Sequence, residues 1–80
     1  MKWLVYIVEC NDKTLYTGIT NNLERRILQH NSGTGAKYTK GRTPVRVLYQ
    51  EECKNRAIAS QRENIIKKMS RAEKLELIES

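Results

Sequence analysis

The chain has 80 residues, and its 15 lysines and arginines against 9 aspartates and glutamates give a net charge of +6. A chain this short builds one small core and has no room for a second module, so we expect a single domain over residues 1–80. The basic excess favours a polyanionic partner such as nucleic acid. Cys10 and Cys53 lie far apart and His30 is the one histidine, which argues against a disulfide framework and a zinc site.

The first apolar segment, Trp3 to Val8, is the longest apolar run of the sequence and has six residues. It is far shorter than the roughly 20 residues that span a bilayer, and no cleavable leader precedes it. We therefore expect a soluble, cytoplasmic protein with no membrane partner. The run is apolar, aromatic and β-branched, which is typical of a central strand covered on both faces.

A β-hairpin is predicted for the first twenty residues. Asn11 to Lys13 supplies turn residues, and Leu15 to Ile19 is typical of a second short strand. Tyr6 and Tyr16 lie on the two arms and face the same side of the sheet if the numbers of paired residues add up to an even sum. The length of the turn leaves that sum open.

A short basic helix follows from about Leu23 to Asn31, with Asn21 or Asn22 as its N-cap and Gly33 placed to end it in the left-handed conformation. The next segment, Ser32 to Pro44, is rich in Gly, Thr, Ser and Lys. This composition is typical of a mobile surface loop and not of a core element, and phosphate-gripping loops have it too.

On this helix Arg26 and His30 are four residues apart, so they lie one above the other on the same flank. Leu23 and Ile27 mark the buried stripe, with His30 at its edge and Arg26 just outside it, a position that faces a cleft. Taken alone, such a pair is more often a solvated charge and a partly packed side chain than a functional site.

The second half of the chain is predicted to add one strand and two helices. Val45 to Gln50 alternates as a third strand, and Asn55 to Met69 forms a helix. Ser70 to Glu73 matches the capping box of a short third helix. The resulting β-β-α-β-α-α order predicts an α+β fold, in which helices flank a small three-stranded mixed or antiparallel sheet. The expected apolar stripe of the second helix consists of Ile58, Ile65, Ile66 and Met69.

Glu63 is predicted at the border of the apolar stripe, beside Ala59 and Ile66, which leaves its carboxylate half-desolvated. Such a group binds a hard divalent cation, or it pairs with Lys67 one turn further on and does nothing else. For an isolated Glu-x-x-x-Lys sequence the ion pair is the commoner outcome.

The positive charge is concentrated between residues 25 and 46, a stretch without acidic residues, and a phosphate backbone is expected to lie there. Its cations are Arg25, Arg26, Lys37, Lys40, Arg42 and Arg46.

Four separated elements together resemble the pattern of the GIY-YIG nuclease superfamily, and they cover nearly the whole chain. They are Leu4-Val5-Tyr6, Tyr16-Thr17-Gly18, the segment Leu23 to Ile27 with His30, and Glu63. The sequence is most similar to the short stand-alone branch, which also carries Gly35 to Thr39 and a terminal Ser-Arg-Ala-Glu-Lys segment. It departs from the pattern at Leu4-Val5, where glycine and isoleucine are missing, and at Ile19, where some DNA-repair members have lysine.

The resemblance implies a metal-dependent DNA endonuclease with Tyr6 and Tyr16 as the motif tyrosines. It also implies that Glu63 holds one Mg²⁺ or Mn²⁺ ion. The general base is then Tyr16 by preference, or His30. The remaining implied roles are the close approach of backbone and substrate for Gly18, phosphate binding for Arg26, a position near the scissile phosphate for His30, and substrate contacts for Arg25, Lys37, Tyr38, Lys40 and Arg42.

Two other functions stay open at this point. One is a nucleic-acid-binding module that hydrolyses nothing by itself, and the other is a protein-interaction adaptor that works through the last two helices. Because no helix-turn-helix or zinc finger accompanies the pattern, recognition of DNA shape, flaps or single strands is favoured over a base-read site. We expect a monomer acting on DNA, with RNA as the alternative substrate, in DNA repair or recombination.

Overall fold

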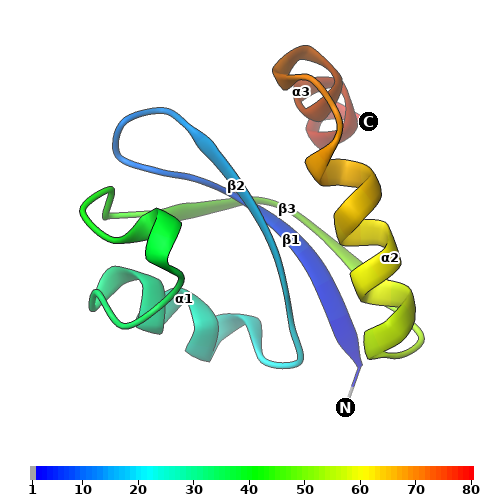
Figure 1. The fold of residues 1–80 in the computed structure, drawn as a ribbon, viewed down its shortest axis with the longest axis horizontal. Helices are drawn as coiled ribbons and strands as arrows, with labels where there is room; N and C mark the ends of the chain where they lie inside the picture. Colours follow the sequence, from blue (N-terminus) through cyan, green and yellow to red (C-terminus); the bar gives the residue numbers. More distant parts are fainter. Residues whose placement is uncertain (1) are drawn as a thin grey trace.

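The computed structural model describes residues 2–80 (Figure 1). Its elements follow the predicted β-β-α-β-α-α order, with one short 3₁₀ turn added before the third strand. They are β1 (Trp3–Glu9), β2 (Leu15–Thr20), α1 (Leu23–Asn31), η1 (Lys37–Thr39), β3 (Arg46–Cys53), α2 (Arg56–Lys67) and α3 (Arg71–Glu79).

The three strands form one sheet in the order β2-β1-β3, and β1 pairs antiparallel with both neighbours. The predicted α+β class and the central position of β1 are confirmed, and the sheet is antiparallel throughout. The third strand runs on past the predicted Gln50 because β1 offers partners as far as Cys53, which pairs with Trp3. This extension was not predicted because it contains two glutamates, which interrupt the alternation of apolar residues.

The register of the hairpin settles which way the tyrosines face. Tyr6 pairs with Gly18, and Val8 pairs with Tyr16. The numbers in each pair add up to an even sum, so Tyr6 and Tyr16 lie on the same face of the sheet.

Helices cover both faces of this sheet (Figure 1). On the face of Tyr6 and Val8, the core includes Leu23 and Ile27 from α1. On the opposite face, Val5 and Ile7 pack with α2 and α3 and with the segment between them. The residues of this core are Ala59 and Ile66 in α2, Leu77 and Ile78 in α3, and Met69 between the two helices. The buried sheet is thus the middle layer of three.

The predicted apolar stripe of α2 is partly wrong. Ile66 and Ala59 are fully buried, whereas Ile58 is 42% and Ile65 is 54% exposed. A three-stranded sheet is narrow and covers only the strip through Ala59 and Ile66, which are seven residues and nearly two turns apart. Ile58 and Ile65 are rotated about 100° away from this strip.

The predicted helix signals are confirmed. Asn22 caps α1 and accepts a hydrogen bond from the Arg25 amide at 3.1 Å, and Gly33, just beyond the end of α1, has a φ of +83°. Asn55 caps α2, and the capping box of Ser70 and Glu73 opens α3. Both cysteines are free and buried. Within residues 2–80, the helices are too short or too polar to cross a bilayer.

Candidate active site

Three aromatic rings form a cluster between the sheet and α1. The ring centroids of Tyr6 and Tyr16 are 6.4 Å apart, and the His30 ring lies 6.0 Å from Tyr6 and 5.5 Å from Tyr16. Tyr6 and His30 are fully buried, while Tyr16 is partly exposed. The structure therefore brings both motif tyrosines and the predicted histidine together.

A chain of hydrogen bonds fixes the tautomer of His30. The Thr39 hydroxyl donates to the Ala36 carbonyl at 2.9 Å, so it accepts from His30 Nδ1 at 2.8 Å. His30 Nε2 is then an acceptor, and it receives the hydroxyl proton of Tyr6 at 2.9 Å.

The pKa values agree with this assignment. Burial raises the pKa of the Tyr6 phenol to about 12, and a hydrogen bond with Arg26 opposes this rise. Burial also lowers the pKa of His30, and the nearby charge of Arg26 lowers it further. At neutral pH both side chains are therefore uncharged, as the hydrogen-bond chain requires.

The structure differs from the prediction that His30 faces a cleft. Both ring nitrogens are used inside the protein, and the segment from Gly35 to Thr39 folds over the ring. A Cβ atom at Gly35 would lie 2.6 Å from His30 Nδ1, so only glycine lets the segment pack this closely. Thr39 is also buried, which contradicts the prediction of a wholly superficial loop. The contact between His30 and Thr39, nine residues apart, does not follow the period of a helix or a strand, so it leaves no periodic signal in the sequence.

Gly18 makes room for the phenol of its cross-strand partner. A Cβ atom at this position would lie 2.6 Å from the Tyr6 hydroxyl oxygen and 2.7 Å from Cζ. Gly18 therefore allows a close approach of Tyr6 to the backbone, and the expected approach of a substrate stays a prediction.

Arg26 and Glu63 both act on the same phenol. After burial, Arg26 is the strongest influence on the pKa of Tyr6 and lowers it, while the charge of Glu63 raises it. Arg26 is half-buried, and its Nη1 donates to the Gln29 side chain at 3.1 Å. The side chain of Glu63 is 16% exposed, and its Oε2 lies 3.3 Å from Lys67 Nζ. The ion pair considered as an alternative from the sequence is therefore present.

An aromatic and cationic stack covers the outer side of Tyr16. The Tyr38 ring lies 5.6 Å from the Tyr16 ring at an interplanar angle of 26°. The Arg42 guanidinium lies 4.4 Å above Tyr38 and donates to the Tyr38 carbonyl at 2.6 Å and to Asp12 at 2.9 Å. Arg42 is thus held within the protein.

The other predicted substrate contacts lie at the surface. Arg25, Lys37 and Lys40 are exposed, and among residues 2–80 they form no ion pair. Arg46, by contrast, pairs with Glu9 at 2.9 Å. The stretch expected to carry the phosphate backbone is therefore neutralised at its C-terminal end.

Comparison with known proteins adds a family to this geometry. A family described as the GIY-YIG catalytic domain matches residues 2–76. The chain belongs to the GIY-YIG family. This membership confirms the resemblance in the sequence and supports an activity of the nuclease kind.

Two similar relatives are UPF0213 proteins, and the match covers most of each of them. The chain is 57% identical to a UPF0213 protein of Clostridium perfringens over 76 residues, which cover 95% of this chain and 82% of the relative. It is 54% identical to a UPF0213 protein of Staphylococcus haemolyticus, covering 98% and 95%.

Two solution NMR structures share the fold. The UPF0213 protein of Bacillus halodurans is 42% identical with a TM-score of 0.63, and a protein of E. faecalis is 36% identical with a TM-score of 0.68. Each match covers 99% of this chain and 84% of the other.

The sequence interpretation missed the roles of Thr39 and Gly35. Both lie in the Gly35 to Thr39 segment, whose likeness to the stand-alone GIY-YIG branch was a signal that the segment is not an ordinary loop. Both residues contact His30, and these contacts form only because the segment folds back over α1.

Proposed function

We propose that this protein is a divalent-metal-dependent endonuclease that hydrolyses phosphodiester bonds in DNA. The observation that carries the proposal is the convergence of the Tyr6, Tyr16 and His30 rings with the charges of Arg26 and Glu63. A phosphodiester resists attack because it is anionic, so a nuclease must neutralise charge that develops on its oxygens and activate water. The cluster contains groups suited to each task.

Arg26 is the group that binds the scissile phosphate. Its guanidinium presents planar donors that match phosphate oxygens, which a lysine would meet only as a point charge. Hydrogen bonds to Gln29 and to the Tyr6 hydroxyl use two of these donors and hold the side chain in place. The other donors are left for the substrate.

Tyr16 is the better of the two candidates for the general base. His30 is buried with both nitrogens hydrogen-bonded, so it cannot reach a water molecule beside the substrate in this conformation. Tyr16 lies at the surface of the cluster and is partly exposed. A water molecule beside the substrate can therefore reach the Tyr16 hydroxyl, which is the access that a general base requires.

Glu63 is the residue that would hold the Mg²⁺ or Mn²⁺ ion. Among residues 2–80 there is no group of three or more His, Cys, Asp or Glu side chains that could hold a metal. A single, largely buried carboxylate nevertheless fits Mg²⁺, which keeps several water ligands and is commonly bound through one or two carboxylates and the substrate phosphate. When bound, the ion would stabilise negative charge on the departing oxygen.

One observation favours a second function, a module that binds nucleic acid without hydrolysing it. The ion pair between Glu63 and Lys67 satisfies the carboxylate within α2. If this pair is all that Glu63 provides, the basic surface binds DNA and nothing is cleaved.

Cleavage of supercoiled plasmid DNA with Mn²⁺ or Mg²⁺ separates the two functions. We expect the wild-type protein to nick the plasmid, Glu63→Ala to lose this activity, and Lys67→Ala to keep it, since Lys67→Ala removes the ion pair but leaves the carboxylate. Circular dichroism melting of both variants checks the fold. Equal losses in both variants, or intact plasmid with the wild-type protein, would favour the binding module. Action in the cytoplasm, in DNA repair or recombination, stays a prediction.

A further inference from the structure

A basic hollow lies next to Arg26, outside the aromatic cluster. It has a volume of about 280 Å³ and is lined by residues that include Trp3, Ile19, Arg25, Arg26 and Arg56. Neither motif tyrosine, nor His30, nor Glu63 lines it. Among the residues that the structure describes, no acidic side chain contributes to its wall.

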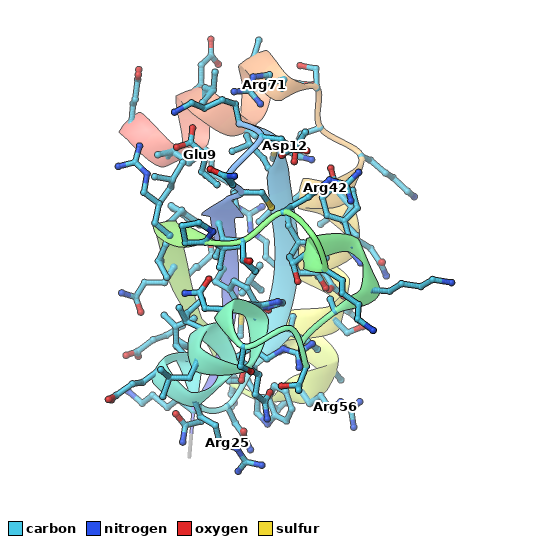
Figure 2. All side chains as sticks on the ribbon, turned by 90° about the vertical axis from the view of Figure 1, so that its left-hand side faces the viewer. Glu9, Asp12, Arg25, Arg42, Arg56 and Arg71 are labelled. Atoms are coloured by element: carbon cyan, nitrogen blue, oxygen red, sulfur yellow. The ribbon has the colours of Figure 1, made fainter. Side chains whose placement is uncertain are left out.

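Residues at the N-terminal ends of two helices line this hollow. Asn22, the N-cap of α1, and Arg56, the first residue of α2, both line it. A helix N-terminus carries partial positive charge, so the two ends add to the field of the three arginines. Figure 2 shows Arg25 and Arg56 at the same end of the molecule.

The hollow also contains an aromatic surface. The Arg56 guanidinium lies 5.5 Å from the centre of the Trp3 ring, within the range of a cation-π contact. Trp3 is the one tryptophan of the chain and is partly exposed. A basic groove beside an aromatic ring is the combination that single-stranded nucleic acid binds, with phosphates on the cations and a base on the ring.

We infer that this hollow is a subsite for the nucleotide next to the scissile phosphate, with Arg25 and Arg56 on its phosphate and Trp3 beside its base. The inference rests on the proposed nuclease function, because Arg26 lines the hollow and also acts on Tyr6, so a strand held there continues into the hollow. The volume is slightly below the 300 to 1,000 Å³ typical of small-molecule pockets and suits one nucleotide unit of a single or frayed strand.

The emission of Trp3 measures occupancy of this subsite directly. A short oligothymidylate, titrated into the full-length protein in EDTA, is expected to change Trp3 fluorescence, since stacking alters the environment of the indole. Polyglutamate at the same charge concentration supplies anions without bases and is expected to leave the emission nearly unchanged. An equal response to polyglutamate would overturn the assignment of a nucleotide to the hollow.

Two arginine variants test the phosphate contacts. Arg56→Ala and Arg25→Ala are each expected to weaken oligothymidylate binding roughly ten-fold, the loss of one charge-assisted hydrogen bond. Each should also make the negative slope of log affinity against log salt less steep by about 0.7. Lys68→Ala removes an exposed cation at the far end of α2 and is expected to change neither quantity. Binding by both arginine variants that matches Lys68→Ala would overturn the inference.

A substrate scan locates the contacted phosphate. Uncharged methylphosphonate linkages are placed one at a time beside the scissile position of a cleavable strand. At the linkage held in the hollow, the substitution should lower the affinity of the wild-type protein for the strand about ten-fold. It should lower the affinity of Arg56→Ala little further, since the two changes remove the same contact. Fully additive losses at every linkage would contradict the subsite.

The subsite and the nuclease proposal can fail separately. Because the fluorescence titration is done in EDTA, it needs no hydrolysis. Intact plasmid together with a salt slope lowered by Arg56→Ala would refute the nuclease and support the subsite. Nicked plasmid together with unchanged binding by both arginine variants would support the nuclease and refute the subsite.

Discussion

The arginines at the two ends of the molecule differ in whether they have partners within the protein (Figure 2). At the end where the hairpin turn meets α3, Arg42 pairs with Asp12 at 2.9 Å, and Arg71 donates to the Lys13 carbonyl at 2.9 Å. At the end where α1 and α2 begin, Arg25 and Arg56 have no acidic partner among residues 2–80. We call these the paired end and the free end.

This difference shows that a count of cations does not locate a binding surface. Arg42 and Arg46 lie in the same acid-free stretch as Arg25 and Arg26. Their partners, Asp12 and Glu9, come from β1 and the turn after it, some 30 and 37 residues away. Arg25, Arg26 and Arg56, which have no acidic partner among residues 2–80, are therefore better placed to meet a polyanion than Arg42 and Arg46.

The largest expected effect distinguishes the two ends by catalysis. Arg26→Ala should lower the initial rate of plasmid nicking by roughly 100-fold or more, the usual loss when a donor to a developing oxyanion is removed. Arg46→Ala at the paired end should leave the rate nearly unchanged, because Glu9 already engages this guanidinium. Gel assays of nicking with Mn²⁺ measure both rates. Similar losses in the two variants would remove the distinction between the ends.

The next effect tests the packing that supports the aromatic cluster. Gly18→Ala should reduce the free energy of unfolding by roughly 1 to 3 kcal/mol, because the new Cβ would lie 2.6 Å from the Tyr6 hydroxyl. In urea denaturation, the double variant with Tyr6→Phe should lose less than the sum of the two single variants, since the clashing oxygen is gone. Strict additivity would show that Gly18 has another role.

Acid should weaken the two regions in different pH windows. In the folded state, burial lowers the pKa of His30 below its ordinary value of 6.5. Below pH 6.5 the unfolded chain therefore binds more protons than the folded chain, and stability falls. The loss is at most about 1.4 kcal/mol for each pH unit. At the paired end, hydrogen bonds from Thr14 and the Arg42 pair lower the pKa of Asp12 from 3.8, so its contribution is lost only near and below that value.

Urea denaturation at pH 7.5 and 5.5 checks the upper window. His30→Gln should abolish most of the difference between the two pH values, whereas Asp12→Asn should retain it. A wild-type protein equally stable at both pH values would contradict the buried, neutral histidine.

The smallest expected effect concerns Arg42. Arg42→Ala should lower stability to urea only slightly, because an exposed ion pair contributes little, and should leave the salt dependence of DNA binding unchanged. The substrate contact implied by the family resemblance predicts instead that the slope against log salt falls by about 1. A binding isotherm at several salt concentrations decides between the two.

The sequence by itself determined the local elements of this protein. The N-cap of α1 at Asn22, one of the two candidates, the capping box at Ser70 and the apolar run of β1 depend on neighbours a few residues away, and all three agree with the predictions. The motif spacing also identified the family, which the match over residues 2–76 confirms.

Only the tertiary structure decided which of these residues meet. The hairpin register, the burial of His30 under the Gly35 to Thr39 segment, and the pairing of Arg42 with Asp12 all join residues from different elements. Such contacts form because strands pair and a loop folds back, and neither event leaves a periodic trace in composition or charge. For the same reason the sequence marked six cations alike, although burial and acidic partners leave only some of them available to a phosphate.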